Sequence, residues 1–284
     1  MYLIPADLSD TGSLVEALKI SNPDEIYHLA AQSFVEASFE TPVATGDVTG
    51  LSVTRILEVV RQLCPDVKFY FASTSEIYGK SGNTNRGLRE EDPFHPLSPY
   101  AAAKLYGYWI TKIYREAYGI FAVNGILFNH ESPLRGLEFV TRKVANEVAK
   151  ISLGLSKELR LGNLNAKRDW GYAPEYVEAM WLMLQEKEPD DYVIATGEAH
   201  SVKELVQKAF DVVGIDWQKY VKVDKRFMRP LDVPSLCGDY SKAKRKLGWI
   251  PRTKFNDLVE LMVKEEVDRW QRWINGERFP WDAP

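Results

Sequence analysis

The sequence contains little cysteine and histidine, no long apolar run and no excess of basic charge. Two of its 284 residues are cysteines, Cys64 and Cys237, and neither they nor the four scattered histidines show metal-ligand spacing. A disulfide framework and a metal site are therefore not indicated. The longest apolar runs, such as residues 123–128, are far too short to span a membrane. A net charge of −4 argues against a nucleic-acid-binding protein, which usually carries a basic field.

The first residues lack the pattern of a secretory leader. Residues 1–7 have neither the charged start nor the long apolar stretch and cleavage site of such leaders. Because no pattern pairs the two cysteines, we expect a cytoplasmic protein with reduced thiols. Apolar residues make up 45% of the chain and charged residues 27%, as in soluble domains. The length suits one large α/β domain, or a core domain with a smaller lobe.

Helical and strand patterns alternate along the first two thirds of the chain. Short apolar runs typical of buried strands lie between segments whose apolar residues recur at helical spacing. This alternation predicts a doubly wound, Rossmann-like parallel sheet with crossover helices on both faces. From residue 201 onward the sequence becomes more helical and polar. Strands are predicted at residues 25–29, 67–72, 121–128 and 192–196, and helices at 13–19, 48–63, 98–118 and 173–185.

Polar or small residues follow three of the predicted strands directly. They are residues 30–33, 73–76 and 129–132, and none of these segments resembles a solvated loop of Lys and Glu. In a doubly wound sheet, ligands bind at the carboxyl ends of the strands. We therefore expect these three segments to line the functional site.

A tyrosine and a lysine stand four residues apart in the helix predicted at residues 98–118. Tyr100 and Lys104 would lie on one face of this helix, one turn apart. An ammonium group beside a phenol favours the phenolate, and so lowers the pKa of the phenol from about 10. The pair therefore predicts that Tyr100 serves as a base near neutral pH.

The surroundings of Tyr100 distinguish it from two other pairs with the same spacing. Ser98 and Pro99 are typical of the N-cap and first residue of a helix, so Tyr100 opens its helix. The three alanines at residues 101–103 leave room for a ligand against this turn. The other pairs indicate ordinary packing and a lysine-rich surface helix. They are Tyr108 with Lys112, and Tyr240 with Lys244.

Thr74, Ser75 and Glu76 form a second group, directly after a predicted strand. Thr and Ser at such a position commonly serve only to cap a helix or shape a turn, and a Glu there is usually solvated. Glu76 gains interest because Tyr100 is expected at the same edge of the sheet. A carboxylate and a phenol in one crevice indicate acid–base chemistry.

Three stretches resemble successive signatures of the GDP-mannose 4,6-dehydratases, nucleotide-sugar enzymes of the extended short-chain dehydrogenase/reductase group. They are residues 71–79 (FASTSEIYG), 98–104 (SPYAAAK) and 127–133 (LFNHESP). The similarity covers nearly the whole chain, because it continues through residues 139–143, 161–164, 168–171, 229–230, 238–239, 242–244 and 247–249. The Tyr-x-x-x-Lys pattern marks only the superfamily. The Thr-Ser-Glu triplet and the Asn-His-Glu-Ser-Pro run are much narrower.

The resemblance implies an internal redox cycle, with GDP-mannose as substrate and NADP as cofactor. Tyr100 would remove the proton of the sugar's 4-hydroxyl while NADP takes hydride from C4, and Thr74 would hydrogen-bond that oxygen. The resulting ketone acidifies the C5–H bond, so Glu76 would remove this proton and help to expel the C6 hydroxyl as water. The hydride would then return to C6, which gives GDP-4-keto-6-deoxymannose and leaves the cofactor unchanged.

The resemblance also implies which residues bind the two ligands. Lys104 would contact the nicotinamide ribose, and Arg168 and Arg229 would bind the GDP moiety through forked contacts to oxygen atoms. The alternative for either arginine is a surface ion pair. Cofactor contacts are implied for Asp7, Leu8, Leu29, Ala30, Ala31, Gln32, Tyr100, Lys104, Leu127, His130 and Arg135. Substrate contacts are implied for Ser75, Asn129, Glu131, Val140, Lys143, Leu161, Gly162, Arg168, Arg229 and Asp232.

The sequence departs from the family pattern at its start. The family's first strand, Gly-x-x-Gly-x-x-Gly loop, first helix and second strand should precede Asp7, and six residues do so here. Two interpretations stay open: the sequence is a fragment of a longer chain, or the protein binds the cofactor poorly. If the chain is truly this short, we expect a sheet without its usual first strands, with an open apolar edge and weak or absent NADP binding. Four substitutions fall in the substrate region. Leu134, Asn165, Tyr172 and Asp232 stand where the family usually has Arg, Asp, His and Glu, respectively.

Two lobes and an oligomer are further implications of the resemblance. The dinucleotide-binding domain would comprise residues 1–130 and 162–198, and a smaller α+β nucleotide-sugar-binding lobe would comprise residues 131–161 and 199–284. The predicted helices that begin near Val48 and Tyr100 carry much apolar surface, and in relatives they pair with their copies as a four-helix interface. We predict a homodimer or homotetramer, with no nucleic-acid or membrane partner.

Two other functions remain open from the sequence. One is an epimerase or reductase for another nucleotide sugar, although Glu76 would then have no role as a C5 base. The other is a non-catalytic homologue that binds nucleotide sugar or pairs with an intact copy.

Overall fold

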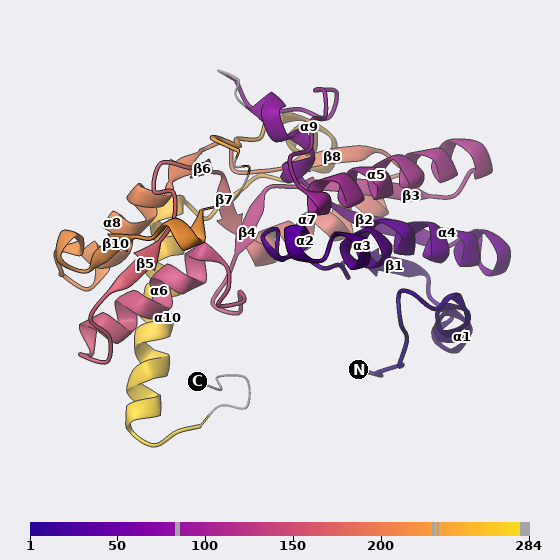
Figure 1. The fold of residues 1–284 in the computed structure, drawn as a ribbon. Helices are drawn as coiled ribbons and strands as arrows, with labels where there is room; N and C mark the ends of the chain where they lie inside the picture. Colours follow the sequence, from indigo (N-terminus) through magenta and orange to yellow (C-terminus); the bar gives the residue numbers. More distant parts are fainter. Residues whose placement is uncertain (83–85, 229–230, 232, 279–284) are drawn as a thin grey trace.

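The computed structural model describes residues 1–82, 86–228, 231 and 233–278. Its central sheet has four parallel strands in the order β1-β2-β3-β8, at the right of Figure 1. The four strands confirm the predicted parallel sheet. They are β1 (Glu25–His28), β2 (Lys68–Thr74), β3 (Ala122–Leu127) and β8 (Asp191–Ile194).

Strand β2 extends two residues beyond its predicted end. Ser73 and Thr74 pair with Ile126 and Leu127 of β3, so they belong to the strand and not to the loop that follows it. Both residues are buried, which allows the ladder to continue to the edge of the sheet. The loop after β2 therefore starts at Ser75, in the 3₁₀ segment η2 (Ser75–Gly82).

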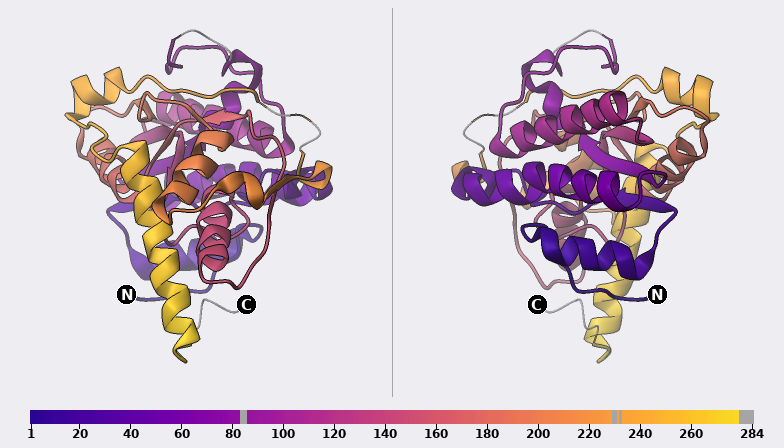
Figure 2. Two further views of the ribbon diagram at one scale, coloured as in Figure 1. Left: turned by 90° about the vertical axis from the view of Figure 1, so that its left-hand side faces the viewer. Right: turned by 90° about the vertical axis from the view of Figure 1, so that its right-hand side faces the viewer.

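Helices cover both faces of the sheet, as the sequence predicted. Alternate side chains of β2 point to opposite faces. Phe69 and Phe71 pack with α1 (Thr11–Ser21), α4 (Ser52–Leu63) and α5 (Pro99–Tyr118), which lie side by side in the right panel of Figure 2. Tyr70 packs on the other face, with α7 (Ala173–Gln185) and α9 (Ser241–Leu247).

The segment before α4 is wound differently from the single helix predicted at residues 48–63. Short helices α2 (Ala37–Glu40) and α3 (Pro42–Thr45) lead into a π-helical stretch, η1 (Gly46–Leu51). Gly50 lies against the main chain of Ala103 on α5, and a Cβ there would stand 3.2 Å from the Ala103 carbonyl oxygen. The absence of a side chain at Gly50 thus allows η1 to pack closely on the first turns of α5.

Helix α5 begins and ends where the sequence indicated. The Ser98 hydroxyl accepts a hydrogen bond of 3.1 Å from the Ala101 N–H, which caps the first turn, and Pro99 is the first helical residue. Gly119 adopts the left-handed conformation (φ 69°) after the last turn. Tyr100 is therefore fixed in the first turn of this helix.

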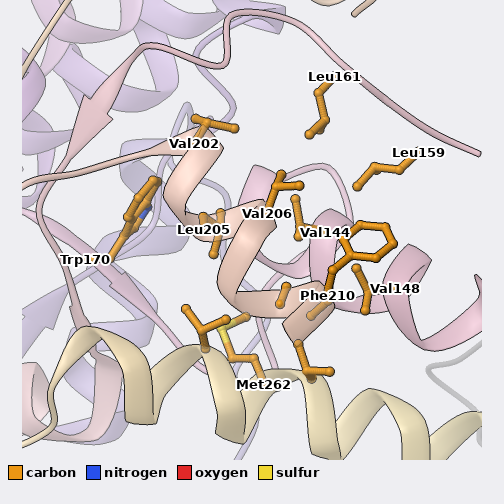
Figure 3. Close-up of a cluster of buried hydrophobic side chains, with 14 of the residues drawn as sticks. Val144, Val148, Leu159, Leu161, Trp170, Val202, Leu205, Val206, Phe210 and Met262 are labelled. Carbon is orange, nitrogen blue, oxygen red and sulfur yellow. The ribbon is translucent and has the colours of Figure 1, made fainter. Parts of the chain in front are cut away.

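A second hydrophobic core lies beside the sheet, at the left of Figure 1. Three helices form it, α6 (Val140–Ser152), α8 (Val202–Val212) and α10 (Phe255–Ile274), together with the paired strands β5 (Leu159–Leu161) and β10 (Val221–Val223). Figure 3 shows Val144, Val206 and Phe210 interlocking at its centre. The remaining elements are β4 (Asn129–Glu131), β6 (Lys167–Arg168), β7 (Trp170–Tyr172), β9 (His200–Ser201), η3 (Trp217–Lys219) and η4 (Lys225–Phe227).

Two short sheets connect the carboxyl side of the central sheet with this second core. Strand β4, which follows β3 after one residue, pairs with β7, and β6 pairs with β9 at the start of α8. None of the helices within the described residues is long and apolar enough to cross a membrane.

Candidate active site

A cavity of about 650 Å³ opens at the carboxyl ends of β1, β2 and β3. Residues from all three segments that follow these strands line it, as predicted, and so do residues of α6 and β5 from the second core and of η4. Thr74, Glu76, Tyr100 and Lys104, the four residues assigned to catalysis, all contribute to its wall. The fold therefore gathers these four side chains around one space.

Tyr100 and Thr74 lie next to each other in this wall. Tyr100 is buried, and the Thr74 side chain lies near its hydroxyl. Burial raises the pKa of Tyr100 to about 12, while the neighbouring Thr74 hydroxyl lowers it by less. The prediction that this pKa falls below its usual value is therefore wrong for the protein without ligands.

The position of Lys104 explains this difference. Its Nζ donates a hydrogen bond of 2.7 Å to the carbonyl oxygen of Ala72 and stands 4.8 Å from the centre of the Phe71 ring. Burial lowers the pKa of Lys104 itself to about 7, because the charged form is poorly solvated there. The ammonium is thus only partly populated at neutral pH, and desolvation of the phenol outweighs any stabilisation of the phenolate.

Glu76 lies in the first turn of η2, directly after Ser75. Its main-chain N–H donates to Thr74 Oγ1 at 3.3 Å, and its carboxylate lines the cavity with 13% of the side chain exposed. Nε of Arg168 approaches Glu76 Oε1 to 3.9 Å. Ser75 is buried and also lines the cavity.

The two other Tyr/Lys pairs lie outside this site, as their surroundings indicated. The Tyr108 hydroxyl donates to Asp191 Oδ2 at 3.2 Å, and its ring packs edge-on against Phe94. Tyr240 packs edge-on against Trp249. Both tyrosines therefore serve packing, and the spacing alone does not mark a catalytic pair.

The residues assigned to cofactor binding divide into two groups. Leu29, Ala31, Leu127, His130 and Arg135 line the cavity with Tyr100 and Lys104. His130 stacks on Tyr176, its Nδ1 is 2.9 Å from the Phe128 carbonyl oxygen, and burial lowers its pKa to about 4. His130 is therefore neutral at physiological pH.

The second group lies outside the described cavity wall. The carboxylate of Asp7 accepts hydrogen bonds from the main chain and hydroxyl of Ser9, and the Leu8 carbonyl accepts from Arg55 at 3.1 Å. Ala30 follows β1 as an exposed residue. The Gln32 N–H donates to the Thr49 hydroxyl, and its side-chain amide donates to the Phe34 carbonyl.

The Ser73 hydroxyl, on the cavity wall, is buried without a hydrogen-bond partner in the described structure. Leaving such a group unsatisfied is costly, so the Ser73 hydroxyl is suited to form a hydrogen bond with a bound polar ligand. Oε1 of Gln32 is also buried without a partner, but Gln32 does not line the cavity.

The substrate residues assigned from the sequence form much of the opposite wall. Asn129, Glu131, Val140, Lys143, Leu161, Gly162 and Arg168 all line the cavity. The Thr141 hydroxyl donates to Glu131 at 2.6 Å, and Arg135 approaches Glu131 to 3.3 Å. Burial raises the pKa of Glu131. Arg229 and Asp232 lie outside the described residues.

Gly162 and Lys143 meet one segment that the sequence did not single out. Lys143 Nζ stands 3.6 Å from the centre of the Phe227 ring, and a Cβ at Gly162 would collide with the Phe227 carbonyl oxygen. Phe227 and Met228 belong to the wall, and they follow β10, a strand that the sequence analysis did not predict. Ser33 and Ser73 also line the cavity, as predicted for their segments. The other unpredicted lining residues are Phe34, Val35, Glu36, Ala72, Phe128, Glu138, Phe139, Thr141, Asn163, Ala166, Trp170, Val177, Met180 and Val202.

Some of these additional residues were within reach of sequence reasoning. Phe34 and Glu36 continue the segment after β1, so the strand-end rule would have included them had it been applied a few residues further. Among the described residues, no cluster of three His, Cys, Asp or Glu side chains could hold a metal ion.

The structure combines a Rossmann-like sheet with a second lobe that completes the cavity. A tyrosine and a lysine lie in the first turns of the helix at the carboxyl edge of the sheet. Together these features define an extended short-chain dehydrogenase/reductase. The model of the family described as GDP-mannose 4,6 dehydratase matches residues 1–262. The chain therefore belongs to the GDP-mannose 4,6-dehydratase family, and the resemblance seen in its motifs is confirmed.

Individual relatives agree with this assignment. GDP-mannose 4,6 dehydratase 1 of Arabidopsis thaliana is 51% identical over 276 residues, which cover 96% of this chain and 76% of the relative. The Homo sapiens enzyme is 51% identical over 287 residues, which cover 94% and 77%. The Sinorhizobium fredii enzyme is 47% identical over 296 residues, which cover 98% and 83%.

Solved structures share the fold. RMD from Pseudomonas aeruginosa, solved with NADPH, superposes with a TM-score of 0.86 at 23% sequence identity. The match covers 94% of this chain and 90% of the RMD chain. The UDP-glucose 4-epimerase of Thermus thermophilus, solved with NAD, superposes with a TM-score of 0.82 at 28% sequence identity. The match covers 93% of this chain and 84% of the epimerase chain. The α/β fold with its second lobe is thus that of nucleotide-sugar short-chain dehydrogenase/reductases.

Proposed function

We propose that this chain converts GDP-mannose to GDP-4-keto-6-deoxymannose with NADP as cofactor. The observation that carries the proposal is the meeting of Thr74, Glu76 and Tyr100 on the wall of one cavity, together with membership of the dehydratase family. Thr74 and Tyr100 would act at the oxygen on C4, and Glu76 would act at C5 and C6.

The residues at the sheet edge suit a dinucleotide. Lys104 would face its nicotinamide ribose, and the Ser73 hydroxyl, which has no hydrogen-bond partner in the described structure, offers a polar group that a ligand can satisfy. When bound, the nicotinamide would accept a hydride from C4 of the sugar and later return it to C6. The remaining steps are proton transfers that belong to the protein.

Tyr100 would accept the proton of the 4-hydroxyl, while Thr74 holds the same oxygen by a hydrogen bond. With a pKa of about 12, the phenol is a weak source of phenolate at neutral pH. Positive charge that enters the cavity with the ligands would have to lower this pKa before Tyr100 acts. The strength of Tyr100 as a base would thus depend on ligand binding.

Glu76 would take the C5 proton once C4 is a ketone, because the carbonyl stabilises the carbanion that forms next to it. The same carboxyl group would then deliver a proton to the C6 hydroxyl, which departs as water. One group can serve as base and then as acid because the first step supplies the proton for the second.

Two substitutions test the assignment of these steps. With GDP-mannose, Glu76→Gln should give a transient rise in NADPH absorbance but little 4-keto-6-deoxy product, because only proton removal at C5 is blocked. Tyr100→Phe should give neither signal. Tyr108→Phe and Tyr240→Phe are controls with identical sequence spacing and should keep turnover. Wild-type dehydration by Glu76→Gln would contradict the mechanism and favour an epimerase or reductase.

The proposal extends to assembly as a homodimer or homotetramer through α4 and α5. Three large apolar residues of α5 are between 42% and 49% exposed, Tyr106, Trp109 and Ile113. The Tyr106 hydroxyl lies 2.9 Å from the Thr54 hydroxyl of α4, so the two helices form one continuous face. Burial of such a face against a second copy would remove it from water.

A further inference from the structure

The resemblance assigned Arg168 to the nucleotide site, and in the structure Arg168 also lies beside Glu76. Its Nε lies 3.9 Å from Oε1 of Glu76, and the two side chains are only 9% and 13% exposed. Solvent screens such a pair far less than it screens an ion pair on the surface. The surface ion pair considered from the sequence is therefore not what the structure contains.

The guanidinium of Arg168 is held by main-chain acceptors. Nη1 donates to the Lys167 carbonyl at 2.9 Å and to the Val233 carbonyl at 2.7 Å. These bonds fix the plane of the guanidinium, so its approach to Glu76 does not depend on a flexible side chain alone.

The neighbouring residue Asp169 anchors the same stretch of backbone. Its carboxylate is fully buried and accepts hydrogen bonds from the main-chain N–H groups of Thr196, Gly197 and Gly238. Strand β6 is thereby tied to the segment after β8 and to the segment around residue 238. Arg168 thus projects from a backbone position that is fixed on several sides.

We propose that Arg168 is a positioning residue for Glu76, holding its carboxylate in place at the cavity wall before C5 is attacked. The proposal rests on the proposed function, because it presumes that Glu76 is the C5 base. The Glu76 carboxylate is largely buried, and the fixed positive charge of Arg168 attracts it to one position in the cavity wall. Without the guanidinium, the carboxylate would lose the charge that holds it in this position.

Positioning of Glu76 and binding of GDP predict different kinetic effects when Arg168 is replaced. If Arg168 served only to bind the nucleotide, its loss would raise the KM for GDP-mannose and leave kcat largely unchanged. If it positions Glu76, its loss would lower kcat at saturating substrate. The first hydride transfer, which precedes the action of Glu76, would continue.

The experiment compares Arg168→Met and Arg168→Lys with the wild type, and uses Arg160→Met, at a surface ion pair with Glu158, as the control. Arg168→Met should lower kcat roughly 100-fold, the scale of a lost acid–base contribution, and should retain the transient NADPH absorbance. Arg168→Lys keeps the charge but loses the fork, so it should recover part of kcat. Arg160→Met should behave like the wild type.

The outcomes are distinguishable from failure of the proposed function. Wild-type kcat in Arg168→Met with a raised KM would overturn the positioning role while Glu76→Gln stays inactive. If Glu76→Gln were itself fully active, the proposed function would fail first. Should Arg168→Met not fold, as judged by circular dichroism, Arg168→Lys decides the matter. A kcat reduced several-fold at unchanged KM supports the proposal, and wild-type kcat refutes it.

Discussion

The Nζ of Lys104 donates a 2.7 Å hydrogen bond to the carbonyl oxygen of Ala72, which attaches helix α5 to strand β2 next to Tyr100. This contact places a lysine that can lose its proton near neutral pH inside the cavity wall. Burial lowers the pKa of Lys104 to about 7, whereas the same group in the unfolded chain titrates near 10.4. The difference has a consequence for stability.

Replacement of Lys104 by Met should change how stability depends on pH. Between pH 7 and 9 the unfolded chain holds this proton and the folded protein does not, so the free energy of unfolding rises with pH. The wild type should gain roughly 2 kcal/mol over this interval relative to Lys104→Met. Chemical denaturation of both proteins at pH 7, 8 and 9 measures this difference. A constant difference between the two would contradict the burial of a titrating lysine.

Asp169 should have the opposite effect in the acidic range. Burial raises its pKa to about 6 from the ordinary value of about 3.9, so the folded protein holds the proton more tightly than the unfolded chain. The contribution of Asp169 to the free energy of unfolding is therefore full below about pH 4 and falls as the pH rises to 6.

Asp169→Asn should remove this dependence. The free energy of unfolding of the wild type, relative to the variant, should decrease by roughly 2–3 kcal/mol between pH 4 and 7. Guanidinium denaturation at four pH values across this range provides the test. Parallel curves for the two proteins would show that Asp169 does not titrate in this window.

Gly162→Ala should impair substrate binding more than folding. The added methyl group would collide with the Phe227 carbonyl, so the segment of η4 that lines the cavity must move. We expect the KM for GDP-mannose to rise about tenfold, the effect of losing roughly 1.4 kcal/mol of uniform binding, with kcat little changed. Gly46→Ala is the control, because its added Cβ meets no atom within 4 Å and its φ of −62° is helical. An unchanged KM in Gly162→Ala would show that η4 makes no contact with substrate.

Ile113→Glu should separate the proposed dimer. A carboxylate at this exposed position of α5 would have to lose its water if the helix were buried against a copy. Light scattering at micromolar concentration should give a dimer or larger assembly for the wild type and a smaller species for the variant. Leu155→Glu, at a position 46% exposed after α6, should leave the assembly intact. A monomeric wild type would refute the proposed interface.

The sequence predicted much of the site because local rules decide it. Ser98, Pro99 and Gly119 fix the limits of α5 by capping, and parallel strands bring their carboxyl ends to one edge, so Glu76 and Tyr100 had to be neighbours. The pKa of Tyr100 could not be predicted in this way. The direction in which this pKa shifts depends on how deeply the phenol is buried and on where the Lys104 ammonium points. Only the packed structure determines both.

Contacts between segments that are distant in the sequence could not be predicted either. The approach of Arg168 to Glu76 depends on β6 pairing with β9 and on the Val233 carbonyl, and no spacing in the sequence reveals either. The contact of Phe227 with Lys143 and Gly162 arises in the same way, from a segment without a strand-end signal.

The two edges of the central sheet differ in what they offer to another chain. Side chains already occupy the β8 edge, since Glu90 accepts from the Val193 N–H at 2.8 Å and Lys242 donates to the Asp191 carbonyl at 2.8 Å. Within the described residues, β1 pairs on one side alone, and Tyr27 and Leu29 near that edge are 36% and 53% exposed. A fibre requires two accepting edges in every copy, whereas a sheet with one can join a single neighbour. Among the described residues, the β1 edge is therefore the one that leaves main-chain groups free for a further strand.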